Sequence, residues 1–233
     1  MTAHAPSSPR SSMGSSTGSS TRSSTGRRTV AVLGAGKLGA AVAALLGRAG
    51  HEVVVWARND KSARAAVQAA PAEVRMRSAA SIAEAVRDAS LVAFAVPATA
   101  LRDVARAAGD VADGAQIALH ACRGVDGEFA LPHQIIRAET CLKKIGALGG
   151  PLYLDDAERG RPLVAVVASR FDEVHRSLRS LIAETHVRLH TTHDVVGVEV
   201  AGALSNVAHI AAGIAEGLGL GETDQGILVT RGL

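Results

Sequence analysis

Aromatic residues are nearly absent from this sequence. Only five occur among 233 residues, although 47% of the chain is hydrophobic and 20% is charged. The core must therefore be built from Ala, Val, Leu and Ile, and stacking platforms for single-stranded nucleic acid are excluded. The balance of hydrophobic and charged residues also excludes wholesale disorder.

Cysteines and long apolar runs are equally scarce. Cys122 and Cys141 form neither a disulfide framework nor a metal-binding pattern, which is typical of a reduced, cytoplasmic protein. The sequence has no uninterrupted apolar run of about 18 residues, so we expect no transmembrane helix.

Acidic residues are missing from positions 1–28, which carry four arginines. Subtracting that +4 from the net charge of +3 leaves the other residues at −1, without the basic stripe of a nucleic-acid-binding domain. Rich in Ser, Thr and Gly, this segment is predicted to be a disordered tail. The alternatives are a transit peptide or, from Arg27-Arg28, a twin-arginine signal. Both are disfavoured because a strand and a glycine turn containing Lys37 follow directly.

From Thr29 onward, short apolar runs alternate with helical stretches. This alternation predicts an α/β fold with a Rossmann-type, doubly wound and mainly parallel sheet. The expected strands are 29–33, 52–56, 91–96, 116–119, 163–167 and 186–189, and the expected helices are 37–49, 81–88 and 171–183.

The character of the chain changes near residue 192. Residues 194–218 form a long stretch rich in Ala, Gly and Val, which predicts a buried helix that is apolar all round. A second helix is expected from Glu222. We therefore predict three parts: a tail (1–28), a dinucleotide-binding domain (29–191) and the first helices of an incomplete all-α domain (192–233). A homodimer or another subunit is expected to cover these helices.

A glycine-rich loop follows the first predicted strand. Gly34, Gly36 and Gly39 fit the G-x-G-x-x-G pattern, with Lys37 and Leu38 between them. The first glycine permits a tight turn, the second lets the backbone approach a pyrophosphate, and the third lets helix and strand pack closely. At this strand–helix junction the pattern predicts binding of NAD or NADP, with the diphosphate at the helix N-terminus.

The second strand ends without the acidic residue that usually binds the adenosine ribose. Arg58 occupies this region instead. An arginine here can bind a 2′-phosphate, which favours NADP, or use of both NAD and NADP, as the cofactor. The alternative is that Arg58 is a surface residue without a role in binding.

Six segments of the chain can be compared with a known family. They are Gly34–Gly39, His51–Trp56, Val96-Pro97, Gly197–Asn206, Gly217–Gly221 and Thr230–Leu233. Together they resemble the bacterial NAD(P)-dependent glycerol-3-phosphate dehydrogenase family. That resemblance implies a Rossmann domain followed by a helical domain, and interconversion of glycerol 3-phosphate and dihydroxyacetone phosphate for phospholipid synthesis.

The resemblance also assigns site residues. Arg123 stands at the position of a family lysine near cofactor and substrate, and keeps its charge. Gly150 and Leu152 lie in the segment that reads Gly-Pro-Ser-Phe in the family, where they imply substrate contacts. Pro97 implies a cofactor contact, and Asn206 could orient a substrate oxygen.

The catalytic position itself departs from the family. The family's Gly-Ala-Leu-Lys-Asn, whose lysine is the acid/base, appears here with Ser205 in place of the lysine. A serine hydroxyl does not titrate near neutrality, so it cannot supply the proton that carbonyl reduction needs. No lysine follows Lys144, and His209, four residues on, is the nearest substitute.

Three functions therefore stay open. The chain is a dehydrogenase of this family, a nucleotide-binding pseudoenzyme or fragment without turnover, or a dehydrogenase of another small hydroxy acid. The family's substrate-phosphate segments match nothing up to Leu233, and 223–225 reads Thr-Asp-Gln where the family has Asn-Ala-Arg. We expect a dinucleotide and a small phosphorylated substrate as ligands.

We expect no metal site. His120 and Cys122, at a strand end, lack a third ligand and are interpreted as cleft lining. The histidines at 186, 190 and 193 lack zinc spacing, and Asp155-Asp156 is interpreted as part of a polar loop.

Overall fold

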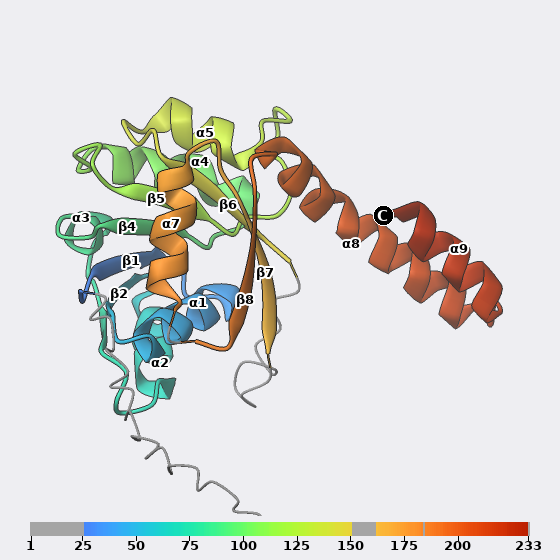
Figure 1. Cartoon of the computed structure of the whole chain (residues 1–233), viewed down its shortest axis with the longest axis horizontal. Coiled ribbons are helices and arrows are strands. Elements are labelled where there is room, and N and C mark those ends of the chain that lie inside the picture. Colours follow the sequence, from blue (N-terminus) through green and yellow to red (C-terminus); the bar gives the residue numbers. More distant parts are fainter. Residues whose placement is uncertain (1–25, 151–161, 184, 233) are drawn as a thin grey trace, which may run out of the picture.

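The apolar segments of the sequence pair side by side in one sheet (Figure 1). The computed structural model describes residues 26–150, 162–183 and 185–232. These residues form eight strands in the order β3-β2-β1-β4-β5-β6-β7-β8. The strands are β1 (Thr29–Leu33), β2 (Glu52–Trp56), β3 (Met76–Ser78), β4 (Leu91–Phe94), β5 (Ile117–His120), β6 (Ile145–Gly149), β7 (Leu163–Ala168) and β8 (Val187–Thr192).

Helices follow most of the strands and cover both faces of the sheet (Figure 1). This arrangement is the predicted doubly wound α/β fold. The helices are α1 (Lys37–Arg48), α2 (Asp60–Ala69), α3 (Ile82–Val86), α4 (Ala98–Gly109), α5 (Pro132–Glu139), α7 (Asp172–Leu181), α8 (Val195–Gly217) and α9 (Glu222–Gly232).

The core consists of two apolar layers, one on each face of the sheet. Successive side chains of a strand point to opposite faces, so β1 contributes Val30 and Val32 to one layer and Ala31 and Leu33 to the other. The first layer packs against α1 and α7, and the second packs against α3, α4 and α5. Because the central strands are buried on both faces, they are continuously apolar rather than alternating.

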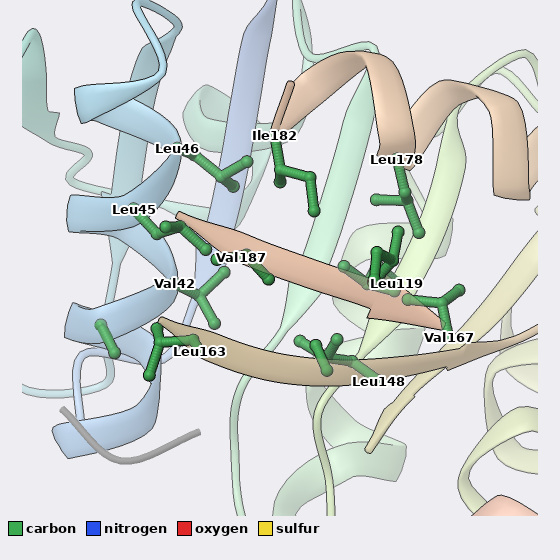
Figure 2. A pocket seen from close by; sticks show the side chains of 13 residues that line it. Val42, Leu45, Leu46, Leu119, Leu148, Leu163, Val167, Leu178, Ile182 and Val187 are labelled. Atoms are coloured by element: carbon green, nitrogen blue, oxygen red, sulfur yellow. The ribbon is translucent and has the colours of Figure 1, made fainter. Parts of the chain in front are cut away.

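One aliphatic cavity lies between the sheet and the two helices α1 and α7 (Figure 2). Its volume is about 60 Å³, and its walls include Leu45, Leu148, Leu163 and Ile182. With only aliphatic side chains around it, the cavity is a packing defect rather than a polar binding site.

The sheet reverses direction once. All neighbouring strands are parallel except β6 and β7, which pair antiparallel with Ala147 opposite Ala168 and Gly149 opposite Val166. As a result, the carboxyl ends of β7 and β8 lie on the same side of the sheet as the amino ends of β1 to β6.

The long helix α8 lies within one residue of its predicted bounds, but the prediction that it is buried is wrong for this chain. Only Val195, Glu199 and Ala215 of α8 are buried. Its first turns pack on β6 and β7, and the remainder projects from the sheet beside α9 (Figure 1). The described residues hold nothing that covers this face. Its exposed apolar side chains include Leu204, Val207, Ile210 and Ile214.

By length and composition alone, α8 would also suit a membrane span, and it is the one helix of the described ranges that would. Core helices of soluble proteins meet the same criterion, so the finding does not by itself indicate a span.

Candidate functional site: a dinucleotide crevice and its flanking helix

The glycine loop between β1 and α1 is held against two neighbouring strands. The N–H of Gly34 donates to the carbonyl of Trp56 at the end of β2, at 2.7 Å. Gly34 has φ +119°, and a Cβ added there would lie 2.3 Å from the carbonyl oxygen of Ala95. A Cβ on Gly39 would lie 2.0 Å from the carbonyl oxygen of Gly34. The backbone packing therefore requires both glycines.

Gly36 differs from these two glycines because a Cβ added there meets no atom within 4 Å. The residue is the N-cap of α1, with no side-chain cap, and no acidic residue lies in the first turn. Lys37 and Leu38 open the helix, so their N–H groups face this space without an intrahelical partner. Open space, free N–H groups and a helix N-terminus fit the diphosphate of a dinucleotide.

Arg58 and Pro97 lie where two other strands leave the same edge of the sheet. Arg58 is exposed two residues after β2, and Asn59 beside it caps α2 by accepting the N–H of Lys61 at 3.0 Å. Pro97 is the exposed N-cap of α4. Because the carboxyl ends of β1, β2 and β4 meet here, both residues flank the glycine loop.

Arg123 connects three of the predicted site elements. It is exposed just after β5, and its Nη2 donates to the carbonyl of Gly150 at 3.1 Å. Its Cγ lies 4.0 Å from the position of a Cβ on Gly202 in α8. Gly150 has φ +101°, which favours glycine. Leu152, Tyr153 and Asp155-Asp156 lie outside the described residues.

Ser205 lies in the next turn of α8 and is half-buried. Its hydroxyl donates to the carbonyl of Gly202 in the preceding turn, at 2.9 Å. Asn206 and His209 are exposed on the same helix. The hydroxyl is thus engaged within its own helix, one turn from Gly202, which lies against Arg123.

A buried charged group anchors α8 to the sheet domain. One oxygen of Glu199 lies 2.8 Å from Nε2 of His120 and accepts the backbone N–H of His133 at 2.7 Å. Its other oxygen accepts Nδ1–H of His133 at 2.5 Å. Burial acts to raise the pKa of Glu199, but the contacts with His120 and His133 outweigh it and lower the pKa to about 2.

Cys122 and His120 have different roles in the structure. Burial raises the pKa of the Cys122 thiol to about 12, so it remains protonated and unreactive, as part of the apolar core. The interpretation of His120 as cleft lining is wrong, because its buried ring lies against the Glu199 carboxylate. Sequence reasoning missed the pair: Glu199 is far from His120 in the chain, and no local spacing connects them.

Two family profiles match this chain. The profile of the NAD-dependent glycerol-3-phosphate dehydrogenase N-terminus covers residues 29–175, and that of the C-terminus of the same enzymes covers residues 194–233. The chain belongs to the NAD-dependent glycerol-3-phosphate dehydrogenase family. The family predicted from the sequence is confirmed.

Curated relatives agree with this assignment. Glycerol-3-phosphate dehydrogenase [NAD(P)+] of Nitrosospira multiformis is 34% identical over 219 residues, covering 88% of this chain and 65% of the relative. The same-named protein of Moorella thermoacetica is 32% identical over 216 residues, covering 89% of this chain and 64% of the relative. The chain therefore spans slightly less than two thirds of the length of these relatives.

A solved structure shares the fold. Glycerol-3-phosphate dehydrogenase from Coxiella burnetii superposes with a TM-score of 0.81 at 23% identity, over 88% of this chain and 66% of that one. This likeness confirms a Rossmann-type sheet followed by part of a helical domain. The positions of Arg123 and Ser205, where the sequence resemblance implies lysines in the family, stay predictions.

Proposed function

We propose that this chain binds NAD or NADP in the crevice at the glycine loop and works as a glycerol-3-phosphate dehydrogenase-type oxidoreductase. The observation that carries the proposal is the uncapped N-terminus of α1 beside the open space at Gly36. When bound, the nicotinamide accepts or delivers a hydride, and the substrates are glycerol 3-phosphate and dihydroxyacetone phosphate. Free cysteines suit a cytoplasmic location.

Each predicted site residue has a role in this proposal. Gly34, Gly36, Lys37, Leu38 and Gly39 surround the diphosphate, and Arg58 binds the adenosine end. Pro97 flanks the nicotinamide side of the crevice. Arg123 places a charge between the cofactor and the anionic substrate, supported by the carbonyl of Gly150, while Asn206 orients a substrate oxygen. Leu152 is assigned to the substrate side from the sequence alone.

The domain division and the partner are also part of the proposal. Residues 29–191 form the dinucleotide domain and residues 192–233 begin the helical domain, while most of the segment 1–28, predicted as a tail, lies outside the described residues. A second copy or another subunit covers the exposed side chains of α8, because a face containing Leu204, Val207 and Ile210 is costly to leave in water.

A second candidate function is a dinucleotide-binding protein without turnover. Ser205 favours it, because a hydroxyl that donates to Gly202 has no titratable proton for a substrate oxygen. His209 is exposed four residues further along the helix and is the nearest group that could supply the proton.

One experiment separates the two functions. Binding of NADH and NADPH to the purified chain is measured by calorimetry, and oxidation of each is followed with dihydroxyacetone phosphate. The dehydrogenase function predicts turnover that is lost in His209→Ala and raised in Ser205→Lys. Binding without turnover in the native chain supports the second function. Absence of dinucleotide binding contradicts both.

The matched control for the added lysine is Ala212→Lys, at a half-buried α8 position about two turns from Ser205. A gain of turnover in Ser205→Lys that is absent from this control assigns the effect to the position rather than to the extra positive charge.

A further inference from the structure

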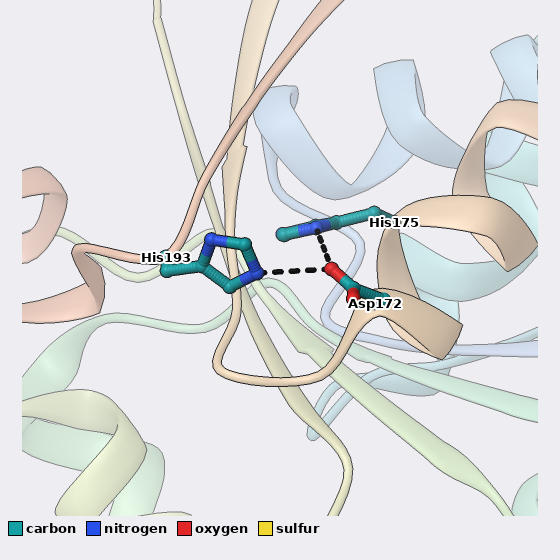
Figure 3. A group of neighbouring side chains, drawn as sticks. All are labelled: Asp172, His175 and His193. Carbon is teal, nitrogen blue, oxygen red and sulfur yellow. Dashed lines mark hydrogen bonds and ion pairs between the residues drawn. The ribbon is translucent and has the colours of Figure 1, made fainter.

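Three potential metal ligands meet beside the start of α7 (Figure 3). Asp172 and His175 lie one turn apart in α7, and His193 lies between β8 and α8. Nε2 of His193 is 2.9 Å from Oδ1 of Asp172, and Nδ1 of His175 is 3.7 Å from the same oxygen. All three ligand atoms lie within 4.8 Å of one another.

The buried ring of His175 has its protonation pattern set by the backbone. Its Nε2 lies 3.1 Å from the carbonyl oxygen of Thr192. A carbonyl oxygen only accepts, so Nε2 carries the hydrogen and the neutral ring has its lone pair on Nδ1. That lone pair faces the carboxylate of Asp172 at a distance too long for a hydrogen bond.

A ring nitrogen and a carboxylate oxygen that face each other at this distance repel unless a proton or a metal ion lies between them. His175 is held firmly in the fold, because only 7% of the residue is exposed. A histidine that binds a metal through one nitrogen usually donates its other N–H to a carbonyl or carboxylate. His175 has this arrangement, with the carbonyl of Thr192 as the acceptor.

The other two ligands are already directed at the same point. The hydrogen bond from His193 is the main cause that lowers the pKa of Asp172, so the carboxylate is ionised at neutral pH. The rings of His175 and His193 lie 5.1 Å apart, edge to face, and each has one nitrogen toward the carboxylate of Asp172 (Figure 3). Two imidazoles and one carboxylate are a common ligand set for Zn²⁺ and leave one position for water.

We propose that Asp172, His175 and His193 form a Zn²⁺-binding site separate from the dinucleotide crevice. The histidines at 186, 190 and 193 are close together in the sequence, but in the structure His193 lies instead with Asp172 and His175 of α7. A metal here would connect α7 to His193, the residue before Asp194. The side chain of Asp194 caps α8 by accepting the N–H of Gly197 at 2.8 Å.

The test uses the full chain without an affinity tag, stripped of metal with a chelator. Zn²⁺ is then titrated by calorimetry in competition with a chromogenic chelator. We expect one equivalent to bind, and His193→Ala and Asp172→Asn to weaken binding by at least about tenfold. His190→Ala removes an exposed histidine of β8 outside the cluster and is the matched control, which should bind as the native chain does.

A second measurement keeps the test independent of the variants' folding. Co²⁺ added to the native chain should give the visible absorption bands of a four-coordinate site with nitrogen ligands. Affinity should fall as pH falls, because protons compete for the histidine nitrogens. Absence of saturable Zn²⁺ uptake, absence of the Co²⁺ bands, or an equal loss in His190→Ala would show that the cluster is only a hydrogen-bond network.

Discussion

His133 of α5 donates both its backbone N–H and its ring Nδ1–H to the carboxylate of Glu199 in α8, at 2.7 and 2.5 Å. The two hydrogen bonds join the sheet domain to the first turns of the helix that carries Ser205. With His120 against the same carboxylate, a single buried negative charge holds the junction together.

The anchor should contribute strongly to stability. Glu199→Ala removes the charge between His120 and His133, and breaking a buried pair of this kind costs roughly 3 kcal/mol or more in unfolding free energy. Glu216→Ala, at an exposed glutamate of the same helix, should change stability by less than about 0.5 kcal/mol. Urea unfolding measures both, and similar small effects would contradict the anchoring role.

Acid should weaken the same junction. The pKa of Glu199 is about 2 in the folded chain, against an ordinary value of 4.5. A lowered pKa means that the ionised form stabilises the fold above pH 4.5, and that this stability is lost as pH falls toward 2. Glu199→Gln does not titrate, so the fall in unfolding free energy over this window should be smaller than in the native chain. Parallel pH curves for the two proteins would disagree with this explanation.

The glycines of the loop should separate stability from binding. Gly36→Ala adds a Cβ into open space at φ −71°, so it should fold normally but bind NADH at least about tenfold more weakly. Gly34→Ala should destabilise the fold as well, because its Cβ meets the carbonyl of Ala95. Gly127→Ala, which also meets no atom within 4 Å, is the control for both measurements. Unchanged NADH affinity in Gly36→Ala would locate the dinucleotide elsewhere.

Arg58 should decide between the two cofactors. Arg58→Ser removes the charge available to a 2′-phosphate, which should weaken NADPH binding by about tenfold, as expected for one lost charge-assisted hydrogen bond, and leave NADH unchanged. Arg87→Ser changes an exposed arginine at the end of α3 and serves as the control. Equal losses for NADH and NADPH would indicate that Arg58 does not contact the 2′ position.

The sequence predicts the central strands because their signals are local. β1 and β2 match their predicted bounds to the residue, since each is an apolar run that ends at a turn. β6 escapes prediction because Ile145–Gly149 contains two glycines and too few β-branched residues. α4 escapes it because Pro97, which ends the apolar run of β4, also caps the helix that begins at once.

The candidate site divides in the same way. The glycine loop is contiguous, so six residues suffice to predict it. The contact of Glu199 with His133 joins residues 66 positions apart, and His175 meets His193 only because β8 returns beside α7. The exposure of α8 also escapes prediction, since an apolar helix indicates that something covers it but not which chain does.

The hydrogen bond from Gly34 to the carbonyl of Trp56 places this tryptophan next to the glycine loop, where its fluorescence can report on the crevice. Trp56 is the only tryptophan of the chain, so its emission comes from one place, the end of β2 beside the glycine loop. Reduced nicotinamide absorbs in the region where tryptophan emits. Occupancy of the crevice can therefore be followed by quenching of the protein's own fluorescence, without a label.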